Sequence, residues 1–321
     1  MKYRRLGGTG LEVSEVSYGV YSLTGMYGEI GVSDAIKILR LAWDLGINLF
    51  DTADVYGKGY GEEILRRAFG DGVKEIVVAT KVGYDIYAPG KRFQRRYDPE
   101  YIEYAVRKSV ERIGKRPIDI LQIHNPPLEV LKSPQLYRTL RNMVERGLAE
   151  HVGIALGPER DVLREALEAI EHSEVEVIQF VYNALEQRPG REIARAAGEK
   201  GIGVLVRVPH ASGILSERID REGTEKLKDH RSLRDKAWLE WAFNLYDAMK
   251  PIFRGYGATP GQNAIRFILS SIPVSSVVVI ATSEEELREY AEAPDKGLLD
   301  PEAVSRIIEL YEEAEKRWVE R

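Results

Sequence analysis

The chain of 321 residues contains no cysteine, which excludes disulfide frameworks, thiolate metal sites and cysteine nucleophiles. It also lacks any apolar run close to the ~20 residues that span a bilayer. Its basic first residues are not followed by the apolar segment of a secretory signal. A net charge of -5 disfavours a nucleic-acid partner. These absences favour a cytoplasmic enzyme that acts on small molecules, with no membrane contact; the sequence gives no indication of oligomeric state.

Eight short apolar segments have the composition of strands that are buried on both faces of a parallel sheet. They are Val16–Val20, Ile47–Phe50, Ile76–Thr80, Ile118–Ile123, His151–Leu156, Val175–Phe180, Ile202–Val206 and Ser276–Ile280. Amphipathic segments lie between and after them, at Ser33–Leu45, Glu62–Phe69, Asp98–Ile113, Leu136–Arg146, Glu159–Ile170, Arg191–Lys200, Asp235–Phe253, Glu284–Ala293 and Pro301–Trp318. Strands that alternate with helices in this number predict an α/β fold, a (β/α)8 TIM barrel.

The barrel is expected to form a single domain over residues 1–321, with an N-terminal β-hairpin between Arg5 and Val13 and extra C-terminal helices. Ser33 is a plausible N-cap for the first helix. Pro251 should kink or end a long helix, and Pro260 should start the next one. The alternative, a doubly wound sheet, needs about six strands and leaves no place for all eight.

Polar side chains follow three consecutive predicted strands, at the barrel end where functional residues gather. Asp51 and Tyr56 follow the second strand, Lys81 the third and His124 the fourth. A lysine close to a tyrosine lowers the phenol pKa from about 10, a carboxylate keeps the lysine charged, and an imidazole can donate to a carbonyl oxygen. Each residue alone is more often a turn, cap or surface residue. The four together indicate a site for proton transfer, with no metal ligands.

Two further patterns leave alternatives open. Asp54 lies close to Asp51, and paired carboxylates could hydrolyse glycosides, but no second strand supplies a carboxylate. A basic segment also follows the third strand, and it is either a solvated loop or a rim that attracts an anionic substrate. Its cations are Lys91, Arg92, Arg95 and Arg96.

Several of these segments resemble the aldo-keto reductase superfamily. The stretch from Gly46 to Gly57, GINLFDTADVYG, is similar to its first signature, and Ala79-Thr80-Lys81 and residues 118–126 are similar to the next two. The N-terminal hairpin and residues 178–183 also fit. The resemblance implies NAD(P)-dependent reduction of aldehydes, ketones or sugars, or oxidation of the alcohols. It makes Tyr56 the general acid and base, Lys81 the residue that lowers the Tyr56 pKa, Asp51 the partner of Lys81, and His124 the residue that orients the carbonyl.

The resemblance also implies contacts to the dinucleotide. Gln179 would hold the nicotinamide carboxamide, Arg207 would replace a stacking aromatic ring, and the loop of residues 212–216 would offer main-chain amides to the pyrophosphate. The full set of expected cofactor contacts is Gln179, Arg207, Pro209, Ser212, Gly213, Leu215, Ser283 and Arg288.

The chain departs from the family pattern at two places. Ala155 and Leu156 stand where the family has serine and asparagine, and Ile280, Glu286 and Tyr290 replace residues that hold the adenosine ribose and its 2′-phosphate. Three consecutive acids at 284–286 should repel a 2′-phosphate, so NAD is slightly favoured over NADP. The alternative is a non-catalytic or regulatory barrel that binds a nucleotide or partner through an altered cofactor site.

Overall fold

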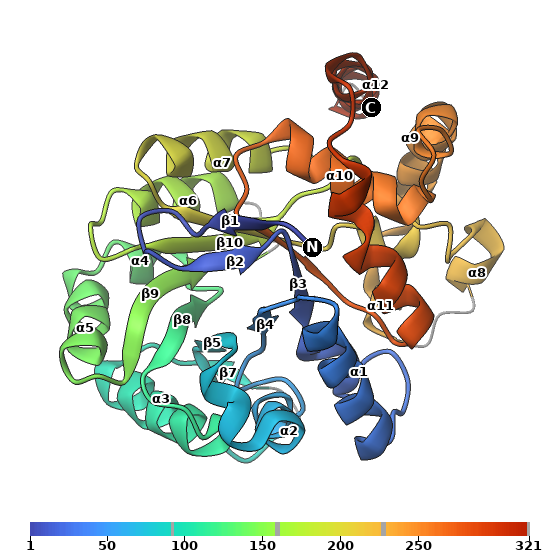
Figure 1. The fold of residues 1–321 in the computed structure, drawn as a ribbon. Helices are drawn as coiled ribbons and strands as arrows, with labels where there is room; N and C mark the ends of the chain where they lie inside the picture. Colours follow the sequence, from blue (N-terminus) through green and yellow to red (C-terminus); the bar gives the residue numbers. More distant parts are fainter. Residues whose placement is uncertain (91–92, 158–160, 226–228, 320–321) are drawn as a thin grey trace.

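Eight parallel strands close into a barrel with helices around it (Figure 1). The computed structural model describes residues 1–90, 93–157, 161–225 and 229–319. The barrel strands are β3 (Val16–Gly19), β4 (Leu49–Asp51), β5 (Val77–Val82), β8 (Ile118–His124), β9 (Ala149–Ala155), β10 (Val177–Val181), β11 (Gly203–Arg207) and β12 (Ser276–Val279). The barrel closes where β3 pairs with both β4 and β12. All eight predicted strands are confirmed, and the doubly wound alternative is excluded.

The expected helices are present around the barrel. They are α1 (Val32–Asp44), α2 (Tyr60–Phe69), α3 (Pro99–Ile113), α5 (Pro134–Glu145), α6 (Val162–Ile170), α7 (Gly190–Glu199), α9 (Lys236–Phe253), α10 (Pro260–Ser271), α11 (Glu284–Ala291) and α12 (Pro301–Val319), with short α4 (Leu128–Leu131) and α8 (Arg221–Glu225) besides. Ser33 does not cap α1, because the extended Gly31 precedes its first residue. Pro251 lies in the last turn of α9, and Pro260 begins α10 behind a Thr259 capping box. The predicted start at Glu159 lies outside the described residues.

The N-terminal hairpin closes the barrel at the amino-terminal end of its strands. Its strands, β1 (Tyr3–Arg5) and β2 (Glu12–Ser14), pair antiparallel, as predicted. Leu6, between them, is completely buried against interior residues of the barrel such as Leu49 and Leu205. A Cβ at Gly203 would lie 2.7 Å from Leu6 Cδ1, so this close approach requires glycine. The opposite, carboxyl-terminal end of the barrel stays open for a site.

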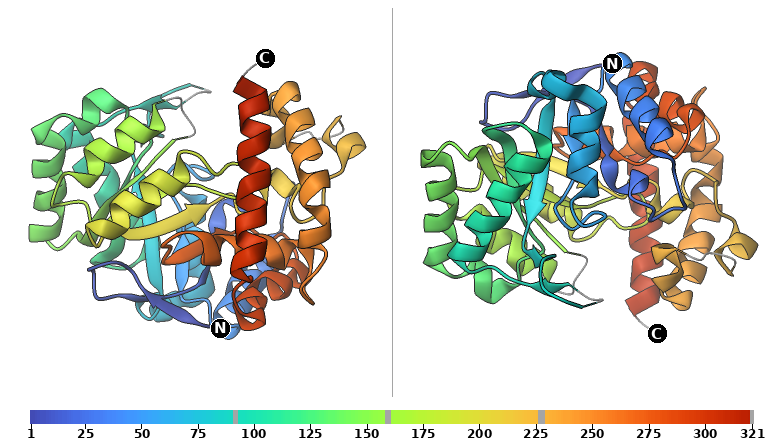
Figure 2. Two further views of the ribbon diagram at one scale, coloured as in Figure 1. Left: turned by 90° about the horizontal axis from the view of Figure 1, so that it is seen from above. Right: turned by 90° about the horizontal axis from the view of Figure 1, so that it is seen from below.

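Two helices, α9 and α12, lie outside the regular strand–helix alternation. They run beside each other at one side of the barrel (Figure 2). Trp241 Nε1 on α9 donates to the carbonyl of Ala314 on α12 at 3.3 Å. The C-terminal helices expected from the sequence are α11 and α12. Within the described ranges, no helix is both long and apolar enough to cross a membrane.

Candidate active site

Three buried polar side chains form one network at the carboxyl ends of β4, β5 and β10. Lys81 Nζ donates to Asp51 Oδ1 at 2.6 Å and to the Thr52 carbonyl at 2.8 Å. Gln179 Nε2 donates to the other Asp51 oxygen at 2.7 Å. Burial lowers the pKa of Lys81, and the Asp51 charge opposes this shift. The ion pair is therefore fixed in position by partners on both of its members.

Tyr56 lies against this network. Lys81 Nζ is 5.1 Å from the centroid of its ring, and the Tyr21 ring meets it edge-on at 4.8 Å. Burial raises the pKa of Tyr56, the Asp51 charge raises it further, and Arg207 lowers it. The phenol therefore keeps its proton at neutral pH. Arg207, and not the expected Lys81, is the cation that lowers the Tyr56 pKa here, while the Lys81 ammonium donates to Asp51 and to the Thr52 carbonyl.

His124 stands next to Tyr56, with ring centroids 6.0 Å apart. Burial lowers the pKa of His124 well below its usual value, and the charges of Lys81 and Arg207 lower it further. The imidazole is therefore neutral at pH 7 and carries one N–H donor. A protonated phenol and a neutral imidazole side by side offer two hydrogen-bond donors to a carbonyl oxygen.

One cavity of about 920 Å³ extends over this end of the barrel and is lined by Asp51, Tyr56, His124 and Arg207. Asn125 also lines this cavity, although it was not among the residues expected from the sequence. Its Oδ1 is buried without a partner in the described part of the chain. Asp54 is completely buried and lies outside the lining. Asp54 therefore has no access to a substrate and cannot act with Asp51 as a glycosidase-like carboxylate pair.

The expected cofactor contacts divide into two groups. Those that line the cavity are Arg207, Pro209, Ser212 and Gly213, together with the departures Ile280, Glu286 and Tyr290. Gln179 and Leu215 are fully buried, Arg288 is exposed, and none of the three is part of the lining. Ser283 caps α11, where its Oγ accepts from the Glu286 amide. Arg207 Nη2 donates to the carbonyl of Leu156 at 3.0 Å, so one of the altered positions helps to hold the guanidinium.

The loop after β11 differs from the expectation. The amides of Gly213 and Leu215 both donate to the His210 carbonyl, at 2.9 and 3.1 Å, and the Ile214 amide donates to Ala211. These three amides are therefore paired within the loop instead of free for a pyrophosphate. The cause is a tight turn in which Ser212 and Gly213 have φ values of 62° and 101°.

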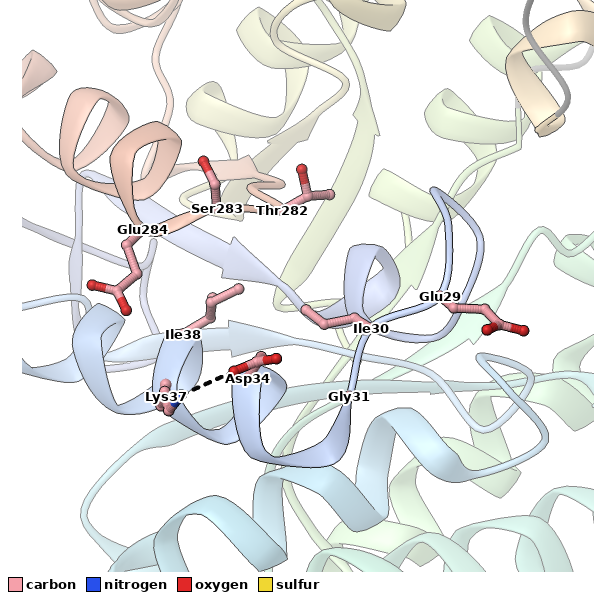
Figure 3. A pocket seen from close by; sticks show the side chains of 9 residues that line it. All are labelled: Glu29, Ile30, Gly31, Asp34, Lys37, Ile38, Thr282, Ser283 and Glu284. Carbon is pink, nitrogen blue, oxygen red and sulfur yellow. Dashed lines mark hydrogen bonds and ion pairs between the residues drawn. The ribbon is translucent and has the colours of Figure 1, made fainter.

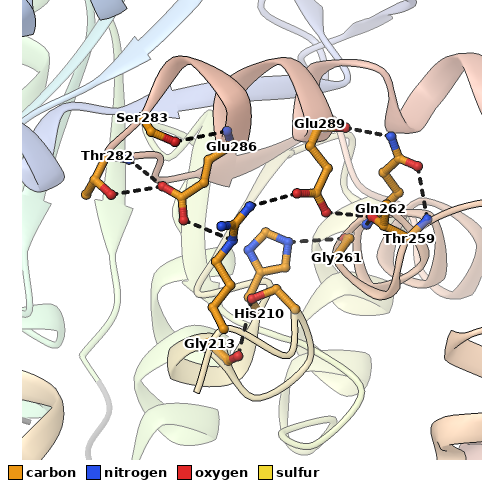
Figure 4. Close-up of polar contacts among 11 residues, drawn as sticks. His210, Gly213, Thr259, Gly261, Gln262, Thr282, Ser283, Glu286 and Glu289 are labelled. Carbon is orange, nitrogen blue, oxygen red and sulfur yellow. Dashed lines mark hydrogen bonds and ion pairs between the residues drawn. The ribbon is translucent and has the colours of Figure 1, made fainter. Parts of the chain in front are cut away.

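Glu286 is the only one of the three consecutive acids that lines the main cavity among the described residues. Its Oε2 accepts from the Thr282 amide at 2.7 Å, and its Oε1 lies 3.0 Å from Arg218 Nε (Figure 4). Arg218 Nη2 also binds Glu289 at 2.8 Å. Glu284 instead lines a separate cavity of about 340 Å³ beside α1 (Figure 3). The cation that pairs with Glu286 in the cavity lining is therefore Arg218, while the predicted Arg288 lies outside the lining.

His210 and Tyr290 form the wall next to this cluster. Their ring centroids are 4.2 Å apart, with 30° between the ring planes. His210 Nε2 is 3.1 Å from the Gly261 carbonyl (Figure 4). Burial lowers the pKa of His210 to about 4.

The basic segment after β5 carries less free charge than the sequence suggests. It forms a small ribbon in which β6 (Tyr84–Asp85) pairs with β7 (Gln94–Arg95). Arg96 is paired with Asp98 at 2.7 Å and with Asp85 at 3.2 Å. Lys91 and Arg92 lie outside the described residues.

Comparisons with known proteins agree with this geometry. Residues 15–312 match the profile of the Aldo/keto reductase family. The holo form of aldo-keto reductase AKR11C1 from Bacillus halodurans superposes with a TM-score of 0.81 at 26% identity, covering 97% of this chain and 96% of that one. A probable voltage-gated potassium channel subunit beta from Oryza sativa is 27% identical over 99% of this chain and 98% of its own length. L-glyceraldehyde 3-phosphate reductase from Escherichia coli O157:H7 is 28% identical over 96% and 91%.

Proposed function

Because the chain belongs to the aldo/keto reductase family, an oxidoreductase family, we propose that it is an NAD(P)-dependent enzyme that reduces aldehydes, ketones or sugars, or oxidises the alcohols, with Tyr56 as general acid and base. The observation that carries the proposal is the placement of Tyr56 and His124 side by side in one large cavity, over the buried Lys81–Asp51 pair. A non-catalytic barrel would have no need of two aligned donors above a buried ion pair.

The residues present fit a nicotinamide dinucleotide. Asn125 lines the cavity, and its Oδ1 is buried without a partner among the described residues, which leaves an acceptor for a carboxamide N–H. Gly19 lines the cavity, and a Cβ there would lie 3.1 Å from Ile280 Cγ2, so glycine keeps a flat space open. Arg207 offers a guanidinium plane for stacking. When bound, the nicotinamide supplies or accepts the hydride.

In the reduction, the chain's own residues position and protonate the carbonyl oxygen. The His124 N–H donates to that oxygen, and the Tyr56 hydroxyl donates and then transfers its proton to it as negative charge develops. Asp51 and Gln179 hold Lys81 in place beneath the phenol. In the oxidation, Tyr56 must first lose its proton, and the nearby positive charge of Arg207 favours the phenolate.

For the cofactor, we propose that NADH binds at least as tightly as NADPH. The Glu286 carboxylate lines the cavity where the adenosine ribose would lie, and it can accept from a free ribose hydroxyl. A 2′-phosphate carries close to two negative charges and would have to break the Arg218–Glu286 ion pair to gain a cation.

Replacing Tyr56 by phenylalanine tests the assignment of the general acid. The variant loses only the phenolic hydroxyl group, so carbonyl reduction should fall by about 10²–10⁴-fold while cofactor affinity stays nearly unchanged. Steady-state rates with a panel of aldehydes, together with cofactor titration, measure both quantities. Tyr60→Phe is the matched control, because this half-buried tyrosine lies outside the cavity lining. Wild-type turnover by the Tyr56 variant would refute the assignment.

A further inference from the structure

Three of the four tryptophans of the chain line one part of the main cavity. Trp238 and Trp241 come from α9, and Trp318 comes from the last turns of α12. Tyr311 of α12 lines the same part. We call these four rings the tryptophan groove. None of the four belongs to the expected cofactor contacts or to the catalytic set.

The rings of the tryptophan groove are held in place by specific contacts. The Arg234 guanidinium lies 4.2 Å from the centroid of Trp238 and is paired with Glu186 at 2.8 Å. The Trp241 ring packs against Tyr311 at 6.0 Å and Trp318 at 5.9 Å. A groove whose walls are fixed before binding pays little ordering entropy on binding.

Charged side chains border these rings inside the same cavity. Arg188, Glu186, Glu315 and Arg234 all contribute to the lining. The Glu315 carboxylate accepts from the Tyr311 hydroxyl at 2.8 Å and lies 3.6 Å from Arg188. A wholly apolar ligand would remove these charges from water without replacing their hydrogen bonds. A sugar ring has apolar C–H faces for the aromatic rings and hydroxyl groups around its edge for the charged side chains.

We propose that the tryptophan groove binds a sugar ring attached to the part of the substrate that carries the reacting carbonyl. The inference rests on the proposed function, because the groove and Tyr56 belong to one continuous cavity. It assigns the enzyme a glycosylated or oligosaccharide substrate with its reactive end at Tyr56 and His124. The sugar ring beyond that end would lie against the α9 and α12 side chains that line the cavity.

Trp318→Ala tests the proposal, with cellobiose as the disaccharide probe and glyceraldehyde as the short one. The ratio of kcat/KM for cellobiose to that for glyceraldehyde should fall about tenfold, which corresponds to the loss of one aromatic contact. Trp43→Ala is a matched control, because Trp43 on α1 and Trp318 are both 37% exposed and only Trp318 lines the cavity. The control should leave the ratio unchanged. Equal effects of the two variants would overturn the proposal.

A binding measurement separates this proposal from the proposed function. Cellobiose should change the tryptophan fluorescence of the wild-type protein in a saturable way, and the change should shrink in Trp318→Ala and in Trp238→Ala. Saturable binding without turnover of any carbonyl compound would support the groove and refute the reductase. Turnover of glyceraldehyde without any response to cellobiose would refute the groove alone. A response to 2-naphthaldehyde in place of cellobiose would show that the groove takes flat apolar groups, which also refutes the sugar.

Discussion

Two cations near Tyr56 have different partners. Lys81 donates to Asp51 and to the Thr52 carbonyl. Arg207 donates to the Leu156 carbonyl and lines the cavity. Arg207 is also the cation that lowers the pKa of the phenol against its burial. At the level of single residues, the balance between proton donation and proton acceptance by Tyr56 therefore depends on Arg207 as well as on Lys81.

Arg207→Met should shift the pH profile of alcohol oxidation upward. Oxidation requires the phenolate, and removing a neighbouring positive charge raises the phenol pKa by about one unit or more. Lys81→Met should also shift the pH profile upward, because the Asp51 charge, which raises the Tyr56 pKa, would then lack its cation. The measurement is kcat/KM for an alcohol against pH, and Arg288→Met, exposed and outside the lining, is the control. If both active-site variants kept the parent profile, neither cation would tune Tyr56.

Glu286→Arg should raise the affinity for NADPH selectively. The change replaces a carboxylate in the cavity by a cation. The attraction of the α11 N-terminus for an anion, about 0.3–1 kcal/mol, stays the same. Dissociation constants for NADH and NADPH come from quenching of tryptophan fluorescence. Glu284→Arg adds the same charge in the separate cavity beside α1 and should change the preference little. A parent that bound NADPH tenfold more tightly than NADH would mean that Arg218 leaves Glu286 for the phosphate.

Among the elements, the N-terminal hairpin contributes to stability without touching the site. Leu6→Ala should lower the free energy of unfolding by about 2–5 kcal/mol, because it opens a cavity in the closed end of the barrel. Urea denaturation measures the change. Leu298→Ala, at a side chain that is 57% exposed, should have almost no effect. Equal stability of the Leu6 variant and the parent would show that the hairpin does not seal the barrel.

The strands and the positions of the proposed catalytic residues were predictable because both depend on local sequence. A strand buried on both faces must be apolar, and Asp51, Tyr56, Lys81 and His124 stand directly at or after such strands. Arg218 was not predictable, since its partner Glu289 is 71 residues away and no local pattern links them. The paired amides after β11 were also missed, because the turn depends on a left-handed Ser212 that its sequence does not require.

The tryptophan groove was also not predictable from local sequence, because two helices form it. The i, i+3 spacing of Trp238 and Trp241 is that of one helix face, but the approach of Trp318 depends on how α12 packs against α9. The spacing of apolar residues within one helix does not predict how that helix packs against another helix far away in the sequence.

The molecule as a whole should lose stability in mild acid. His210 is 7% exposed, and its pKa is about 4 against an ordinary 6.5. Between these values the unfolded chain binds a proton that the folded chain does not, so stability is present above pH 6.5 and is lost as pH falls toward 4. The lowered pKa of His124 also makes the free energy of unfolding fall as the pH falls.

His210→Gln isolates this contribution, because glutamine can still donate to the Gly261 carbonyl but does not titrate. Between pH 7 and pH 4.5, the parent should lose about 2–3 kcal/mol more unfolding free energy than the variant. Urea denaturation at the two pH values gives the difference. The same loss in both proteins would show that His210 is protonated in the folded state.

The pairing of β3 with β12 has a consequence for biosynthesis. On the ribosome, β3 emerges long before β12, whose Val277 amide donates to Glu15 and whose Ser276 hydroxyl donates to Ser14. Until most of the chain has been translated, one edge of β3 has no partner, and an unpaired edge strand invites pairing with other chains. A nascent chain that stalls before residue 276 therefore exposes that edge, and we expect it to depend on chaperones to avoid aggregation.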